Sequence, residues 1–436
     1  MPHIQPLKIE MAPLAELTVS PRHTRRVTRP QLRRVKRSIS KFGFIVPILI
    51  DACGRIIAGV ARVEAAKALG YREAPSIRLE HLTPEQVEAF AIAENRLVET
   101  GEWDDDMLAV VFKDLSALDL DFGLDITGFT LPEIDLKIAG IDQGDDAADD
   151  PDDRAVPPGP SVVQHGDLWI LGRHRLICGS CLETEVWTRL MAGAVAAIII
   201  ADLPYNCAIT GHVSSTDKFR EFAMASGEMG EAEFQAFMLQ ACHRMAEFSR
   251  DGALSYLFMD WRNIHGLLGA CREAYDALIN LCVWVKPQGG MGSFYRSAHE
   301  LIAVVKKGAA PHQNNVQLGR FGRDRRNTFF YPGANAFLRS GEDAEFAGQH
   351  PTPKPVQMLA DILMDASSRG ELVVDPFCGS GATLIAAERM GRICNAIELD
   401  PLYCDLIIRR WQRHTGQVAV REDGESFIDL ERRAAS

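Results

Sequence analysis

One stretch near the C-terminal end combines residue types that can bind a small polar ligand. Residues 372–374 form a short apolar, β-branched run, which is typical of a buried strand. The glycines that follow, Gly379 and Gly381, allow a tight turn and a close approach of the backbone to a ligand. Residues 383–390 have helical composition. A strand, a glycine turn and a helix N-terminus together predict a site for a small polar ligand.

A carboxylate follows at the position where such a site needs a hydroxyl acceptor. The apolar run 393–399 carries Glu398 near its carboxyl end, about twenty residues past the turn, where an acceptor for ribose hydroxyls is expected. The glycine spacing is F-x-G-x-G, so the turn is not the G-x-G-x-x-G dinucleotide fingerprint. Alone, it would also fit an ordinary strand-to-helix turn. Further apolar runs at 252–259, 281–286 and 301–305 predict more strands.

A second candidate stretch is Asp202-Leu203-Pro204-Tyr205, which directly follows the all-apolar run 196–201. Such a run predicts a buried parallel strand. The carboxyl ends of buried strands are where open α/β sheets place their sites, so an acid and an aromatic ring there are candidate site residues. Alone, the four residues would also fit a turn at a strand end.

Together, the two stretches resemble the motifs of the S-adenosylmethionine-dependent amino-methyltransferases of DNA. The glycine turn after Asp-Pro is similar to the F-x-G-x-G cofactor motif, and residues 202–205 are similar to the D-P-P-Y catalytic motif. The catalytic stretch precedes the glycine turn, an order that resembles the beta class. The resemblance implies a Rossmann-like α/β domain that binds S-adenosylmethionine through Asp375, Phe377, Gly379, Gly381 and Glu398.

The resemblance also implies methyl transfer to the 6-amino group of adenine in double-stranded DNA. This amino group is a poor nucleophile because its lone pair is delocalised into the ring. Asp202 and the carbonyl of Leu203 would accept its two hydrogens, and Tyr205 would stack on a base flipped out of the duplex. Leu203 stands where the family has proline, but its place before Pro204 still favours an extended backbone.

Three further features bear on the resemblance. Lys354 lies in a segment similar to the one that introduces the cofactor helix, and it is either a contact to the methionine carboxylate or a solvated lysine. Ser180 stands where the family usually has an aspartate near the cofactor adenine.

The insert 306–349 would hold target recognition, because it is rich in Arg, Asn and Gln, which read major-groove edges. Its candidate DNA-binding residues are Arg320, Arg323, Arg325 and Arg326.

The N-terminal part contains a basic run and a second resemblance. Residues 17–50 carry nine Lys or Arg and no acid, which fits either a phosphate-contacting patch or a solvated helix face. Two short strands, at 45–50 and 55–57, precede a G-x-x-R-x-x-A-A helix that contains Arg62. This arrangement resembles the N-terminal domain of ParB-type partition proteins, an α+β fold shared with sulfiredoxin. The resemblance implies that Arg62 either holds a phosphate, of nucleotide or DNA, or braces the turn.

An acidic segment separates the two resemblances. Residues 142–153 carry seven aspartates and no base, and prolines lie in and after this run, which favours a linker over a packed element. The sequence therefore predicts a ParB-like domain over 1–140, a linker over 141–163, a methyltransferase domain over 164–416 and a C-terminal tail over 417–436.

Composition limits the other classes of protein. The 436 residues are 47% hydrophobic, enough for two or three packed domains. No secretory signal and no apolar stretch of membrane-spanning length is evident. The ten cysteines form no framework, which suits a cytoplasmic protein, and the single C-x-x-C does not suffice for a structural metal. The oligomeric state stays open, and a homodimer is compatible with the sequence.

Two alternatives to an adenine methyltransferase remain. Enzymes that methylate the amino group of cytosine usually carry Ser where this chain has Asp202. A ParB-like DNA-binding protein with an impaired methyltransferase domain would account for Leu203 and Ser180. A nicotinamide dehydrogenase is disfavoured because G-x-G-x-x-G is absent. The sequence leaves open the target site and the biological role, whether in restriction-modification or in regulation.

Overall fold

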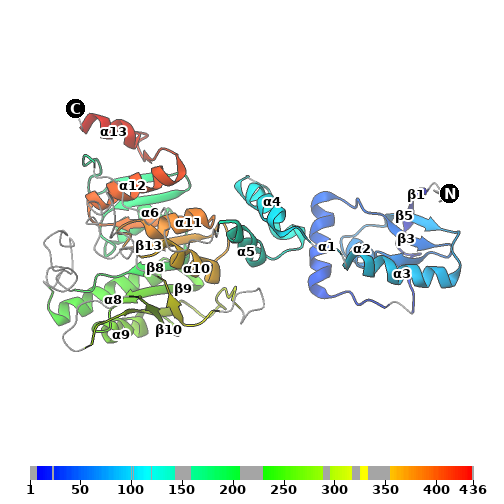
Figure 1. Ribbon diagram of the computed structural model, residues 1–436, viewed down its shortest axis with the longest axis horizontal. Helices are drawn as coiled ribbons and strands as arrows, with labels where there is room; N and C mark the ends of the chain where they lie inside the picture. Colours follow the sequence, from blue (N-terminus) through cyan, green and yellow to red (C-terminus); the bar gives the residue numbers. More distant parts are fainter. Residues whose placement is uncertain are drawn as a thin grey trace. The chain divides into compact units, whose positions relative to one another are not determined.

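The computed structural model describes residues 7–21, 24–99, 101, 103–118, 120–142, 159–206, 229–287, 295–316, 325–331 and 354–434. It divides into two compact units, Met1–Ile141 and Asp142–Ser436, and Figure 1 shows their elements. Each unit has hydrophobic cores of its own. None of the helices in the described ranges combines the length and the apolar composition that a membrane crossing needs.

The first unit contains a small mixed sheet, as the ParB-like expectation of an α+β fold requires. In the described part of the chain its strand order is β1-β5-β3-β4-β2. The strands are β1 Ile9–Pro13, β2 Thr18–Val19, β3 Ile48–Asp51, β4 Arg55–Ala58 and β5 Glu73–Leu79, and the helices beside them are α1 Arg29–Phe42, α2 Val60–Ala68 and α3 Pro84–Glu99. Ile48, Ile50 and Ala66 are fully buried in the core of this sheet.

A separate helical cluster completes the first unit. It comprises α4 Asp105–Ala117, the 3-10 helix η1 Leu124–Thr127 and α5 Leu131–Asp142, with a core around Phe112 and Ile134. Asp125 of η1 forms an ion pair with Arg37 of α1, which ties this cluster to the basic helix. The buried residues of this cluster form a hydrophobic core that is distinct from the core of the sheet.

The second unit is built on a large sheet that, among the described residues, has the order β12-β10-β11-β9-β8-β13-β14-β7-β6-β15. The strands are β6 Leu168–Leu171, β7 His174–Cys178, β8 Ala196–Asp202, β9 Ser249–Met259, β10 Ala277–Val285, β11 His299–Lys306, β12 Thr328–Phe330, β13 Leu372–Asp375, β14 Ile393–Glu398 and β15 Val420–Arg421. The helices are α6 Thr184–Met191, α8 Glu231–Glu247, α9 Ile264–Ala274, α10 Val356–Ala366, α11 Ala382–Arg389, α12 Pro401–Thr415 and α13 Phe427–Ala434.

The five central strands β9-β8-β13-β14-β7 are all parallel, so their carboxyl ends share one edge. The chain leads from β8 to β9 on one side and from β13 to β14 on the other, which makes the gap between β8 and β13 a topological switch point. β11 is antiparallel to β9 and β10, so its first residues lie at that same edge. The expected Rossmann-like α/β fold is confirmed, and each apolar run expected as a strand corresponds to one.

Two boundaries of the second unit differ from expectation. Residues 417–436, expected as a tail, contribute β15, which pairs with β6, and α13, whose Phe427 is fully buried against Trp169. At the other end, the backbone N–H groups of Val162 and Val163 donate to Asp405 at 3.0–3.3 Å, inside the segment expected as a linker. Burial of a few apolar side chains outweighs the charged, loop-like composition of both segments.

Candidate active site

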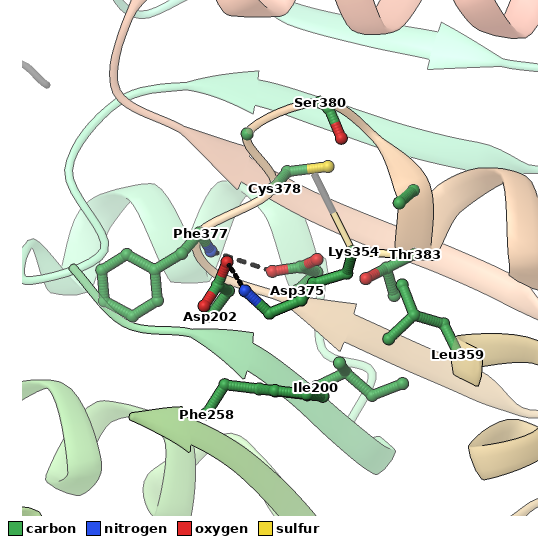
Figure 2. A pocket seen from close by; sticks show the side chains of 12 residues that line it. Ile200, Asp202, Phe258, Lys354, Leu359, Asp375, Phe377, Cys378, Ser380 and Thr383 are labelled. Carbon is green, nitrogen blue, oxygen red and sulfur yellow. Dashed lines mark hydrogen bonds and ion pairs between the residues drawn. The ribbon is translucent and has the colours of Figure 1, made fainter. Parts of the chain in front are cut away.

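The two candidate stretches meet at the switch point of the large sheet. Asp202 ends β8 and Asp375 ends the neighbouring strand β13, and both line one cavity (Figure 2). The other lining residues come from β8 and β9, from α10 and the residues just before it, and from the glycine turn and the start of α11: Ile200, Phe258, Lys354, Leu359, Phe377, Cys378, Gly379, Ser380, Ala382 and Thr383.

The glycine turn is held tightly against its surroundings. The carboxylate of Asp375 accepts the N–H of Phe377 at 3.0 Å, which turns the chain sharply after β13. Gly381 caps α11 with φ +80°, and a Cβ there would lie 3.2 Å from Ile407. A side chain at this position would need both a strained backbone and a shift of α12, so glycine is required.

Glu398 fixes the turn from the next strand. Its carboxylate accepts the N–H of Gly379 at 2.8 Å and the N–H of Asp400 at 2.9 Å. Burial raises the pKa of Glu398 to about 7, against the lowering effect of these two hydrogen bonds. Burial likewise raises the pKa of Asp375 to about 7, although the hydroxyl of Thr383 and the N–H of Phe377 oppose it. Each oxygen of Glu398 retains a lone pair that can accept a ligand hydroxyl.

Lys354 joins the catalytic stretch to a second acid. Its ammonium lies 2.5 Å from Asp202 and 3.2 Å from Glu300, as the dashed line to Asp202 in Figure 2 shows. Glu300 in turn pairs with Lys286 at 2.5 Å. The rings of Tyr205, Phe258 and Trp284 lie 5.3–5.8 Å from the Lys354 ammonium and favour its charge. We call Asp202, Tyr205, Lys286, Glu300 and Lys354 the ion network.

Tyr205 also belongs to the ion network through its hydroxyl. The oxygen lies 3.0 Å from Asp202 and 2.9 Å from Glu300. Burial raises the pKa of Tyr205 well above its ordinary value, and the two nearby carboxylates add to that effect, so the phenol stays protonated. A base-stacking ring was expected here, and the structure adds a hydrogen-bonding role for the hydroxyl.

In the ion network, the opposite charges of the acids and the lysines counteract the effect of burial on their pKa values. Burial tends to raise the pKa of Glu300, but the ammonium groups of Lys354 and Lys286 lower it to about 2. Burial tends to lower the pKa of Lys354, but Asp202 and Glu300 raise it above its ordinary value. Burial raises the pKa of Asp202, and the charge of Glu300 adds to this, while Lys354 opposes it. Glu300 and Lys354 are therefore charged at neutral pH.

The turn after Asp202 is anchored on both sides. Leu203 is 1% exposed and packs in the hydrophobic core under the sheet, which explains a leucine at this position. The carbonyl of Tyr205 accepts a hydrogen bond from Asn263 at 2.8 Å, and the side chain of Asn206 bonds the backbone of Met229. Leu203, which stands where the related motif has proline, is thus fixed in place by burial.

Glu300 and Lys286 were missed by the sequence reasoning. Lys286 ends an apolar run expected as a strand, and Glu300 precedes another. Charged residues at both strand ends were a usable indication, because they mark the edge of a sheet. The antiparallel direction of β11, which brings Glu300 to the edge that carries Asp202, could not be read from those runs.

The expected DNA-binding residues have different surroundings. Arg320 and Arg323 lie outside the described residues. Arg325, expected to read DNA, instead donates to Asp365 at 3.2 Å and to the hydroxyl of Tyr331 at 3.1 Å, and it forms an ion pair with Asp361. Its guanidinium therefore already has partners inside the domain, and a role of Arg325 in reading DNA stays a prediction. Arg326 is exposed.

In the first unit, Arg62 folds back on the glycine turn that starts α2. Gly59 has φ +104°, and a Cβ there would lie 3.0 Å from the guanidinium of Arg62. That guanidinium also donates to the carbonyl of Pro47 at 3.4 Å. The guanidinium thus lies against the glycine turn, and its role, in bracing this turn or in holding a phosphate, stays a prediction. In the basic run, Arg37 and Lys41 form ion pairs with Asp125 and Asp121.

Other arginines of the basic run are exposed on or just before α1: Arg25, Arg26, Arg29, Arg33 and Arg34. Within the described ranges, no group of His, Cys, Asp and Glu side chains is arranged to hold a metal ion.

Comparisons with known protein families cover most of the chain. The family described as ParB N-terminal domain matches residues 3–96, and that described as ParB-methyltransferase HTH domain matches 106–165. The N6_N4 family described as DNA methylase matches residues 196–409. The last range contains every residue of the ion network and the whole glycine turn.

Individual relatives are distant. The chain is 23% identical over 229 residues to the type II methyltransferase M2.MboI of Moraxella bovis, covering 50% of this chain and 81% of that protein. It is 25% identical over 230 residues to the putative methylase YubD of Escherichia coli (strain K12), covering 52% and 84%. A crystal structure of an M1.HpyAVI–SAM complex aligns with 17% identity and a TM-score of 0.40, covering 54% of this chain and 97% of that one. The chain thus joins a ParB-like N-terminal domain to a DNA methyltransferase domain of the N6_N4 family.

Proposed function

We propose that this protein transfers a methyl group from S-adenosylmethionine to the 6-amino group of adenine in double-stranded DNA. The observation that carries the proposal is that the acid of the catalytic stretch and the glycine turn line one cavity at the switch point. A methyl donor held by the turn and an amino group held by Asp202 would be neighbours there. Asp202, where cytosine enzymes usually have Ser, favours adenine as the substrate.

The glycine turn supplies the cofactor site in this proposal. Glu398 accepts the ribose hydroxyls through lone pairs that its backbone hydrogen bonds leave available. Gly379 and Gly381 let the backbone approach the cofactor closely. Asp375 and Phe377 complete the site.

The catalytic stretch supplies the amino-group site. Asp202 and the carbonyl of Leu203 accept the two amino hydrogens and return electron density to the nitrogen. Bound S-adenosylmethionine would supply the methyl group: the nitrogen would bond to the methyl carbon as the carbon–sulfur bond broke, S-adenosylhomocysteine would be left, and the surplus amino proton would pass to the Asp202 carboxylate. Tyr205 stacks on the flipped base, and Pro204 keeps Leu203 extended. No covalent enzyme intermediate is needed, and burial raises the pKa of the Cys181, Cys378, Cys394 and Cys404 thiols, which keeps them protonated.

The ParB-like module, residues 1–140, contacts the DNA backbone in this proposal. Its exposed arginines on or near α1 are the groups that would meet phosphates. In the catalytic domain, Arg326 is the exposed described arginine of the target-recognition insert, residues 306–349.

The proposal is tested by sequencing the modified bases of DNA from cells that express the protein. We expect N6-methyladenine in a defined sequence context with the wild-type protein and none with Asp202→Ala. N4-methylcytosine would move the enzyme to the other substrate class. Unmodified DNA from wild-type cells would favour a DNA-binding protein with an impaired catalytic domain.

A further inference from the structure

Glu300 is a buried acid placed beside the catalytic stretch by a strand of opposite direction. It lies one residue inside β11, where it pairs with Trp284 across the sheet, and it is 4% exposed. Its carboxylate contacts Lys286 at 2.5 Å, Lys354 at 3.2 Å and the hydroxyl of Tyr205 at 2.9 Å. A buried charge is expensive unless it is paired, so three such contacts point to a specific use.

Two of these contacts are shared with Asp202. The Lys354 ammonium lies within reach of both acids, and so does the hydroxyl of Tyr205. A phenol has only one hydrogen to donate, so Tyr205 serves either Asp202 or Glu300 at a given moment. The two donors that occupy Asp202 therefore each have a second acceptor at hydrogen-bond or ion-pair distance.

The shared donors matter for the proposed reaction, because Asp202 has to bind the substrate amino group. Oδ1 of Asp202 already accepts from Tyr205 and Oδ2 from Lys354, and both donors, the cation above all, draw electron density from the carboxylate that must accept a hydrogen from the substrate amino group. Leaving a buried donor without a partner would cost about 1–3 kcal/mol, and more for a charged donor. If the donor moves to Glu300 instead, that penalty is avoided and Asp202 becomes a stronger acceptor for the amino group.

We propose that Glu300 is a positioning residue that accepts the Tyr205 hydroxyl and the Lys354 ammonium when a substrate amino group takes their place on Asp202. This inference rests on the proposed methyl transfer. Lys286 keeps Glu300 ionised, and so ready to accept, because it contributes a second ammonium to the network. The charges then balance, with two carboxylates, two ammonium groups and a neutral phenol.

The test compares the pH dependence of kcat for the wild-type protein and Glu300→Gln, measured as transfer of labelled methyl to duplex DNA. The amide oxygen of Gln still accepts a hydrogen bond but carries no negative charge, so it holds the ammonium more weakly and kcat should fall by about 10- to 100-fold. The charged groups that face Asp202 are Lys354, Glu300 and Asp375. Loss of the Glu300 charge removes an influence that raises the pKa of Asp202, so the acidic limb of the profile should move to lower pH.

Two further variants separate this role from a structural one. Glu388→Gln alters a half-buried acid, whose carboxylate contacts His174 and Trp411 and is outside the ion network, so its acidic limb should stay in place. Lys286→Met combined with Glu300→Gln removes one charge of each sign, which keeps the network balanced if the single variant fails to fold. The double variant should still have a low kcat, because the amide has no negative charge with which to draw the Lys354 ammonium from Asp202.

The outcomes distinguish the two proposals. A Glu300→Gln protein with the kcat and pH profile of the wild type would overturn the positioning role and leave the methyl transfer intact. Full activity of the double variant would also overturn it, because Glu300 would then only neutralise Lys286. If the wild-type protein transfers no methyl group and binds no S-adenosylhomocysteine, the proposed function itself fails.

Discussion

At the scale of residues, the acids around the cavity differ because their neighbours differ. Glu300 faces two ammonium groups, and its pKa is lowered to about 2 despite burial. Glu398 and Asp375 accept hydrogen bonds from uncharged donors, and burial raises the pKa of each to about 7. Glu300, beside the catalytic stretch, is therefore ionised at neutral pH. Asp375 and Glu398, beside the glycine turn, titrate near neutral pH.

Glu398 should make the stability of the protein depend on pH. A raised pKa means that protonation stabilises the folded state, so the contribution is present below 4.5 and is lost as pH rises through about 7. Glu398→Gln removes this dependence. The free energy of unfolding of the wild type relative to the variant should therefore fall by about 3 kcal/mol at most between pH 4.5 and pH 8.

Chemical denaturation at several pH values measures this difference. Glu422→Gln, at an exposed position of the same domain, is the control, and its difference from the wild type should stay nearly constant with pH. A constant difference for Glu398→Gln as well would contradict the account of this acid.

Leu203 supplies a second prediction at this scale. Leu203→Pro restores the family's residue but removes a side chain that fills the core. Stability should fall by about 1–3 kcal/mol, while activity per folded molecule stays the same or rises, because the backbone carbonyl is kept. Denaturation and methyl transfer on the same preparations measure both. Unchanged stability together with lost activity would show that the leucine side chain acts in the reaction.

At the scale of elements, the parallel strands of the large sheet made the main site predictable. Asp202, Asp375 and Glu398 each end an apolar run, and parallel strands bring their carboxyl ends to one edge. The partners of Asp202 were harder to foresee, because Glu300 lies at the start of β11 and Lys354 just before α10, and the placement of both elements depends on tertiary packing. The segment 417–436 was misjudged for a similar reason, since two strand residues and one buried ring outweigh its polar composition.

The helix α10 carries a further testable feature. Its acids Asp361 and Asp365 both contact Arg325, whose side chain is 23% exposed. Arg325→Ala leaves these carboxylates without their cation and should lower the stability by about 1–3 kcal/mol. Arg326→Ala, next in the chain and exposed, is the matched control and should leave stability within about 0.5 kcal/mol.

Thermal unfolding of the two variants and their affinity for duplex DNA show whether Arg325 stabilises the domain or binds DNA. We expect Arg326→Ala to weaken DNA binding and Arg325→Ala to weaken stability. The reverse pattern, with Arg325→Ala fully stable but poor in DNA binding, would identify Arg325 as a DNA-reading residue.

At the scale of the whole molecule, the net charge is −12, but the acidic and basic residues are unevenly distributed along the chain. Seven aspartates lie in residues 142–153, while the basic run carries nine Lys or Arg and no acid. The motifs in the sequence predicted the ParB-like domain and the methyltransferase domain. They did not predict that residues 106–165 form a module of their own, and the sequence analysis included part of this range in the ParB-like domain. Its own hydrophobic core, around Phe112 and Ile134, depends on contacts between α4, η1 and α5 that a single sequence does not show.

The basic run leads to a prediction for the intact chain. Replacing Arg26, Arg29, Arg33 and Arg34 by Gln should weaken DNA binding and flatten its salt dependence. Each lost phosphate contact should reduce the slope of log K against log salt by about 0.9. Replacement of Arg37 and Lys41, which pair with aspartates, is the control for stability. An unchanged affinity and salt slope would identify the run as a solvated helix face.

The central claim is that Asp202 polarises an adenine amino group beside a bound methyl donor. Purified wild-type protein and Asp202→Ala are incubated with labelled S-adenosylmethionine and duplex DNA, and the product nucleosides are separated. The account predicts labelled N6-methyladenine from the wild type and none from Asp202→Ala, with S-adenosylhomocysteine bound by both proteins. Labelled N6-methyladenine from Asp202→Ala at the wild-type rate, or label in cytosine alone, would contradict it.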